Sequence, residues 1–99
     1  MLYIINKSPS QSQALKNCVD QAIADDVILL IENAVYAAIN STQSNLLQLL
    51  NDQVVVYALT PDLQARGIGL DQCYGGVEPV DYAGFVMLVT EHQPVRSCF

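Results

Sequence analysis

Short apolar runs, rich in β-branched residues, recur along the whole chain, and segments with helical spacing separate them. An alternation of strands and helices predicts βαβ units, and hence a mostly parallel sheet with helices on both faces. Pro79 either weakens the fourth run or places it near a sheet edge, because proline cannot donate to the ladder. No internal repeat or linker divides the sequence. We therefore expect one three-layer α/β domain over residues 1–99, with strands at Leu2–Ile5, Val27–Ile31, Val54–Leu59, Val77–Val80 and Val95–Phe99.

The first helix is expected to begin at Ser8. Ser8 would be its N-cap, Pro9 its first helical residue, and Gln11 the partner that completes a capping box. Apolar residues then recur three and four positions apart, which is typical of one buried helix face. The residues of this face are Leu15, Cys18, Val19, Ala22 and Ile23.

Further helical segments follow the later strands. Ala34–Ile39 is a short one, and a leucine-rich helix is expected to follow the caps at positions 41 and 42. Another begins at Thr60 and ends at Gly67, which has the character of a left-handed C-terminal residue. Asp81 is expected to cap the last helix, whose buried face would be Tyr82, Phe85, Val86 and Val89.

The composition is unusually apolar for a small domain: 52% of the residues are hydrophobic and 14% are charged, against about 25% charged on average. A chain of 99 residues cannot hide that much apolar surface alone, which predicts a permanent partner. The apolar runs are too short for a membrane helix, and the start lacks the basic region of a signal peptide, so we expect a cytoplasmic protein. The net charge of −6 argues against direct binding of nucleic acid.

The three cysteines are spaced too widely for a zinc site or a disulfide framework, so free thiols are expected. Cys18, on the first helix, is either a buried small hydrophobic residue or a persulfide-carrying or redox thiol. Cys73 lies in a glycine-rich loop and is expected to be exposed, reactive or merely incidental. Cys98 is either a strand or interface residue or part of a mobile tail.

Polar segments at the predicted strand ends form no recognised catalytic constellation, although ligands of such sheets gather there. Lys7 and Arg66 could bind an anion, or they are solvated charges, with Arg66 paired to an acid. His92 is favoured at a helix end by the helix dipole, and the alternative is a general base. The polar segments at the predicted strand ends are 6–8, 32–33, 60–62 and Asp81.

Four ordered blocks, spread over nearly the whole chain, resemble the TusB/DsrH family. The family pattern of a hydrophobic residue, a basic residue and Ser-Pro is matched by the opening Ile5–Pro9. A penultimate tryptophan that is usual in the family is replaced here by Cys98. The other three blocks read ILLIENAVYAAI at 28–39, VYALTPDLQARG at 56–67 and VDYAGFVMLV at 80–89.

This resemblance implies a DsrE-like fold and a heterohexamer with TusC/DsrF-like and TusD/DsrE-like subunits. It implies persulfide relay that ends in 2-thiolation of the tRNA wobble uridine, with the principal persulfide cysteine on a sister subunit. Cys18 falls where DsrH proteins also carry a cysteine, which makes it a candidate persulfide carrier. The alternatives are a DsrH-type subunit in cytoplasmic sulfur oxidation and a purely structural subunit. No cofactor and no metal are expected.

Overall fold

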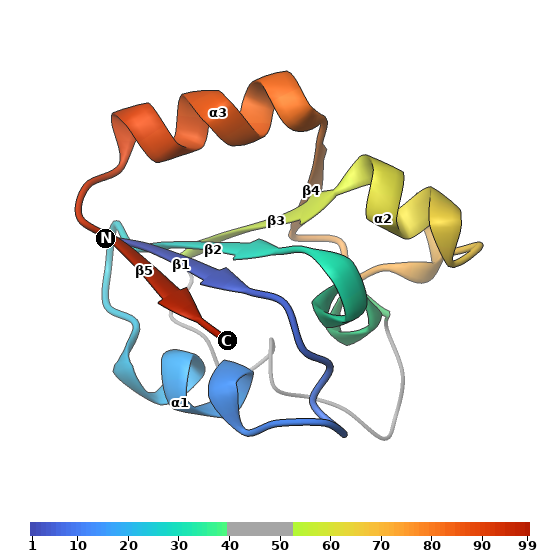
Figure 1. Cartoon of the computed structure of the whole chain (residues 1–99), viewed down its shortest axis with the longest axis horizontal. Helices are drawn as coiled ribbons and strands as arrows, with labels where there is room; N and C mark the ends of the chain where they lie inside the picture. The colour runs from blue at the N-terminus through green and yellow to red at the C-terminus, as the bar shows by residue number, and fades with distance from the viewer. Residues whose placement is uncertain (40–52) are drawn as a thin grey trace.

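The computed structural model describes residues 1–39 and 53–99, which form one five-stranded sheet (Figure 1). Every neighbouring pair of strands is parallel, and the strand order is β4-β3-β2-β1-β5. The predicted strands are confirmed to within a residue at each end. Their bounds are β1 Leu2–Ile5, β2 Val27–Leu30, β3 Val55–Leu59, β4 Val77–Val80 and β5 Val95–Cys98.

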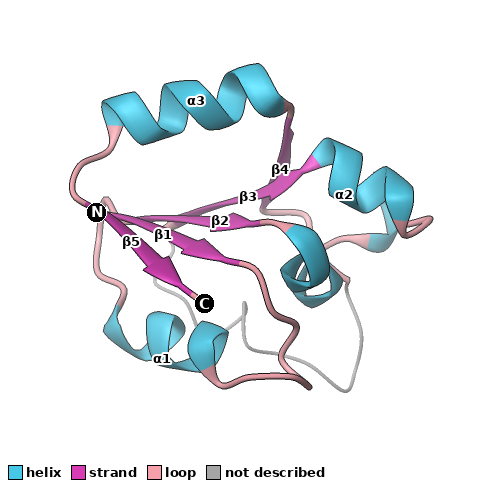
Figure 2. Ribbon diagram, in the orientation of Figure 1, coloured by secondary structure: helices cyan, strands magenta, loops and turns pink. Residues whose placement is uncertain are grey.

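Helices cover both faces of the sheet (Figure 2). The chain steps from β1 to β4 in one direction, so right-handed crossovers place α1 (Ala14–Gln21), the 3₁₀ helix η1 (Glu32–Ala38) and α2 (Thr60–Ala65) on one face. The return from β4 to β5 crosses the sheet in the opposite direction and places α3 (Tyr82–Glu91) on the other face. The predicted three-layer α/β architecture is therefore confirmed.

The sheet separates two apolar cores. Alternate residues of β1 point to opposite faces: Tyr3 and Ile5 enter the core under α1, whereas Leu2 and Ile4 enter the core under α3. β1 and β2 are buried on both sides, as expected for central parallel strands. Position along the strand thus decides which helix a side chain meets.

The first helix begins at Ala14, five residues later than the capping pattern at Ser8 predicts. The backbone N–H groups of Gln11 and Ser12 donate to the Ser8 carbonyl at 3.0 and 3.2 Å, which makes a single turn. Ser12 Oγ then accepts from the Ala14 N–H at 3.1 Å and starts α1 afresh. The Gln11 side chain does bond back to the Ser8 N–H at 3.1 Å, so this half of the capping box exists outside the helix.

Two predicted buried faces are partly wrong. Ile23 is 67% exposed because α1 ends at Gln21 and the Ile23 N–H donates to Asp26. On α3, Tyr82 and Val86 are exposed, whereas Leu88 enters the core. Apolar residues lie on every side of this helix, so their spacing alone could not identify the inward face.

The predictions for the cap of α3, for the end of α2 and for the edge strand are confirmed. Asp81 Oδ1 accepts from the Gly84 N–H at 2.8 Å and caps α3 as predicted. Gly67 has a φ of 68°, the left-handed conformation expected after α2. β4, which contains Pro79, is an edge strand. The predicted leucine-rich helix after position 42 lies outside the described residues. Within the described ranges, no helix combines the length and apolarity that crossing a bilayer would require.

Candidate functional site

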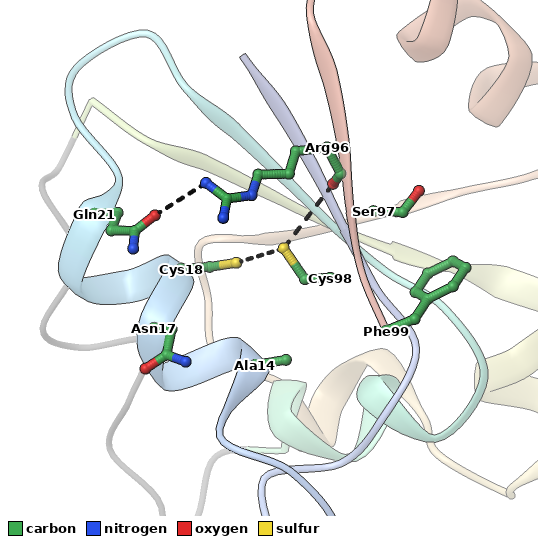
Figure 3. A pocket seen from close by; sticks show the side chains of 8 residues that line it. All are labelled: Ala14, Asn17, Cys18, Gln21, Arg96, Ser97, Cys98 and Phe99. Carbon is green, nitrogen blue, oxygen red and sulfur yellow. Dashed lines mark hydrogen bonds between the residues drawn. The ribbon is translucent and has the colours of Figure 1, made fainter.

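A pocket of about 250 Å³ opens between α1 and β5, and two of the three cysteines line it. Figure 3 shows Cys18 and Cys98 pointing toward one another, with Arg96 beside them. The complete lining is Ala14, Asn17, Cys18, Gln21, Arg96, Ser97, Cys98 and Phe99.

Element periodicity explains why these side chains meet. In β5, Arg96 and Cys98 are two residues apart, so both face α1. The helix residues that line the pocket recur at three and four residue spacings and form one stripe of α1, at Ala14, Asn17, Cys18 and Gln21. Strand order completes the site, because β5 pairs with β1 directly above this helix.

The Cys18 and Cys98 Sγ atoms are 3.0 Å apart, close enough for an S–H···S hydrogen bond. Arg96 lies at the rim, where its Nη1 is 3.4 Å from Gln21 Oε1. Ser97 and Phe99 lie on the far side of β5 from the two sulfurs (Figure 3). The pocket thus combines a pair of thiols with one positive charge.

Burial, followed by the hydrogen bond and charge of Cys98, raises the pKa of Cys18 to about 12, and nearby Arg96 opposes this effect weakly. Cys18 is only 3% exposed and remains a thiol near neutral pH. Either sulfur can donate the hydrogen bond that joins Cys18 and Cys98. Of the two, Cys98 is the half-buried sulfur that an incoming molecule would reach first.

The prediction that Cys73 is an exposed loop thiol is wrong, because only 8% of its surface is exposed. A bridge between Ile39 and Cys73 and a 2.9 Å hydrogen bond from the Tyr74 N–H to the Ala38 carbonyl tie this loop to η1. Cys73 Sγ lies 3.6 Å from the Gly69 carbonyl oxygen, and burial is the main cause that raises its pKa. These contacts place Cys73 in the core under η1, outside the pocket.

The polar strand ends form a hydrogen-bond network. Arg66 donates from Nε and Nη2 to Asn33 Oδ1 at 3.1 and 2.9 Å, and from Nη1 to the Asp62 carbonyl at 3.1 Å. Its ion pair with Asp62, at 3.7 Å, confirms the predicted pairing to an acid. Asp62 also accepts the Glu32 N–H at 2.7 Å, where Glu32 has a φ of 50°. These bonds join the segments after β2 and β3. Asn33, Asp62 and Arg66 belong to the blocks that carry the family resemblance, and in this structure they stabilise the fold.

The remaining sequence candidates lie elsewhere. His92 is the C-terminal cap of α3, on the opposite face of the sheet from the pocket. Lys7 is exposed after β1. Among the described residues, no group of three or more histidine, cysteine, aspartate or glutamate side chains could hold a metal ion.

The sequence did not predict that Arg96 and Cys98 line the pocket with Cys18. The usable signal was their spacing of two in the last strand, which places both side chains on one face. The identity of the face required the strand order.

Comparison with known proteins gives the family. A family model described as "DsrH like protein" matches residues 7–95. A protein named Protein TusB from Photorhabdus laumondii is 36% identical over 93 residues, covering 93% of this chain and 94% of its own. The chain belongs to the TusB/DsrH family. Protein TusB from Shigella dysenteriae is 34% identical over 94 residues, covering 93% of this chain and 94% of its own. Membership supports a role in sulfur relay.

Solved structures share the fold. The crystal structure of the ychN protein from E. coli has a TM-score of 0.76 at 18% identity, and the alignment covers 97% of each chain. MTH1491 from Methanobacterium thermoautotrophicum, titled a protein of unknown function, has a TM-score of 0.70 at 18% identity and covers 97% of this chain and 95% of its own. At these identities the likeness concerns the fold alone.

Proposed function

We propose that this TusB/DsrH-family chain is a subunit of a heterohexameric sulfurtransferase complex that relays persulfide sulfur for 2-thiolation of the tRNA wobble uridine. The observation that carries the proposal is the 36% identity to a protein named TusB over 93% of the chain. TusC/DsrF-like and TusD/DsrE-like subunits are its proposed partners. The proposed setting is the cytoplasm, where free thiols stay reduced.

The apolar surface of α3 supports assembly with partners. Tyr82, Val86 and Met87 are each about 60% exposed, although all three are large apolar side chains. Tyr82 and Val86 are four positions apart and neighbour each other on the helix surface, and Met87 is the next residue around the helix. Exposed apolar surface of this kind is typical of protein contacts, and it agrees with the excess of apolar residues in the composition.

Within the complex, we assign Cys18 the role of a secondary persulfide carrier and leave the principal carrier to a partner subunit. The pocket at α1 and β5 gives sulfur a route to this thiol. The burial and raised pKa of Cys18 favour a second candidate, a subunit that shapes its partners' sites without a reactive thiol of its own. The match to the DsrH-like family model favours a third, a subunit in cytoplasmic sulfur oxidation.

The test is sulfur transfer by the reconstituted complex, which contains this chain and its two partner subunits. Labelled persulfide sulfur is supplied, and its arrival on tRNA is measured for wild type and for Cys18→Ser. A carrier role predicts that Cys18→Ser slows relay at least tenfold, with an unchanged mass of the complex. Cys73→Ser is the matched control, because it removes a thiol outside the pocket.

Each alternative has its own outcome. Relay at the wild-type rate in Cys18→Ser would leave the structural role. Loss of the whole chain without any loss of tRNA thiolation in cells would remove the tRNA assignment. Neighbouring genes for sulfite reductase would instead favour sulfur oxidation.

A further inference from the structure

We propose that Cys98 and Cys18 form a dithiol site that reacts with small disulfides and closes into a reversible intramolecular disulfide. The proposal stands on the geometry of the pocket. Closure would occupy the Cys18 sulfur and prevent it from carrying persulfide. Only this consequence for sulfur relay rests on the proposed function.

Three observations support the pairing. The two sulfurs face one another at 3.0 Å, so a bond of about 2.05 Å requires them to approach by roughly 1 Å. They belong to elements that are packed together, α1 and the end of β5, and they open on the same pocket. Cys98 is the last residue of β5, so it lies at the end of the ladder that this strand forms with β1.

The order of reaction follows from access. Cys98 is half-buried and opens on the pocket, whereas Cys18 is enclosed, with 3% of its surface exposed. The Cys98 thiolate attacks a small disulfide RSSR, forms the mixed disulfide Cys98–S–S–R and expels RS⁻. Cys18 then attacks the Cys98 sulfur, and its proton leaves with the second RSH. The balance is two protein thiols and one RSSR giving one protein disulfide and two RSH.

The second step is intramolecular. Proximity of the reacting sulfurs compensates for the small thiolate fraction of Cys18, because well-oriented groups behave as if highly concentrated. Its raised pKa also falls partly back once Cys98 is derivatised, since the hydrogen bond and charge of Cys98 contribute to the shift. The mixed disulfide is therefore short-lived in the wild type.

The experiment uses the full chain, fully reduced and then treated with oxidised glutathione. Intact mass should show the loss of two hydrogen atoms from a single chain, with no retained glutathione. Trypsin cleaves after lysine and arginine and places each cysteine on its own peptide, so the cross-link can be mapped without ambiguity: 17–66, 67–96 and 97–99. The expected cross-link joins the first of these peptides to the last.

Variants identify the role of each thiol. Cys18→Ser should retain glutathione on Cys98, with a mixed disulfide that lives at least tenfold longer than in the wild type. Cys98→Ser should stay unmodified at Cys18, and Cys73→Ser should close like the wild type. Circular dichroism before treatment identifies a variant that has not folded, and the wild-type map alone then decides.

Two results would overturn the proposal: a folded wild-type chain that keeps glutathione on separate cysteines, or a disulfide that includes Cys73. The relay assay is independent of this result. If the disulfide closes but Cys18→Ser relays sulfur normally, the dithiol site is supported and the carrier role is excluded. If the disulfide does not close but Cys18→Ser slows relay, the carrier role is supported and the dithiol site is excluded.

Discussion

Replacing Arg66 by alanine removes the guanidinium that joins the ends of β2 and β3. Its two bonds to Asn33 Oδ1 are charge-assisted, and such hydrogen bonds contribute about 1.5–3 kcal/mol. The ion pair with Asp62, whose side chains are both 20% exposed, adds only about 0.2–1 kcal/mol because solvent screens it. The Tyr36 ring, 5.9 Å from the guanidinium carbon, adds about 0.5 kcal/mol. We expect Arg66→Ala to lower the free energy of unfolding by about 3 kcal/mol.

Urea unfolding followed by circular dichroism measures this loss, at low protein concentration so that self-association does not contribute. With a urea dependence of about 1.5 kcal/mol per molar, the midpoint should fall by about 2 M. Arg66→Lys keeps the charge and loses the planar fork, so it should recover less than half of the loss. Lys16→Ala, on an exposed position of α1, is the control and should stay within about 0.5 kcal/mol of wild type.

A double-mutant cycle separates the bond to Asn33 from the other effects. If the network is as described, Asn33→Ala and Arg66→Ala should couple by about 1–2 kcal/mol, because each removes the same contact. A loss of less than about 0.5 kcal/mol in Arg66→Ala, or strict additivity of the two changes, would show that the Arg66–Asn33 bonds do not stabilise the fold.

Three further perturbations test other parts of the structure. Leu88→Ala should cost about 2–5 kcal/mol in urea unfolding because Leu88 enters the core under α3, whereas exposed Met87→Ala should cost under about 0.5 kcal/mol; equal effects would contradict the assigned face. Asp81→Ala should cost about 1 kcal/mol by loss of the α3 cap, and an unchanged unfolding midpoint would count against that cap. Because the pKa of Cys18 is raised from 9.0 to about 12, the folded state holds this proton more tightly, so the contribution is complete below pH 9 and is lost as pH rises toward 12. Unfolding measured from pH 8 to pH 10.5 should therefore show the wild type losing stability relative to Cys18→Ala, and parallel curves would disprove the shift.

The strands could be predicted because their information is local. Runs such as Val27–Leu30 are apolar at every position, because a strand that is covered on both faces buries all of its side chains. Caps and left-handed glycines are equally local, which is why Asp81 and Gly67 behave as expected. Local signals failed where two possible helix starts, Ser8 and Ser12, competed. Ser12 Oγ accepts the Ala14 N–H, and α1 begins later than the pattern at Ser8 predicted.

The site could not be predicted because it depends on strand order. Cys18 and Cys98 are 80 positions apart in sequence and meet only because β5 pairs with β1. The burial of Cys73 has the same kind of cause, a bridge to Ile39 that no local pattern announces. The inward face of α3 was obscured by apolar residues all around the helix.

We propose that neighbouring subunits complete this apolar chain, and the mass of the assembly is the most direct test of that proposal. The chain is co-expressed with TusC/DsrF-like and TusD/DsrE-like subunits from the same source, and the purified material is weighed by native mass spectrometry. We predict one species with two copies of each of the three subunits, and self-association or precipitation when the chain is expressed alone. A chain that stays a well-behaved monomer at high concentration, while the other two subunits assemble without it, would show that neighbouring subunits do not complete it.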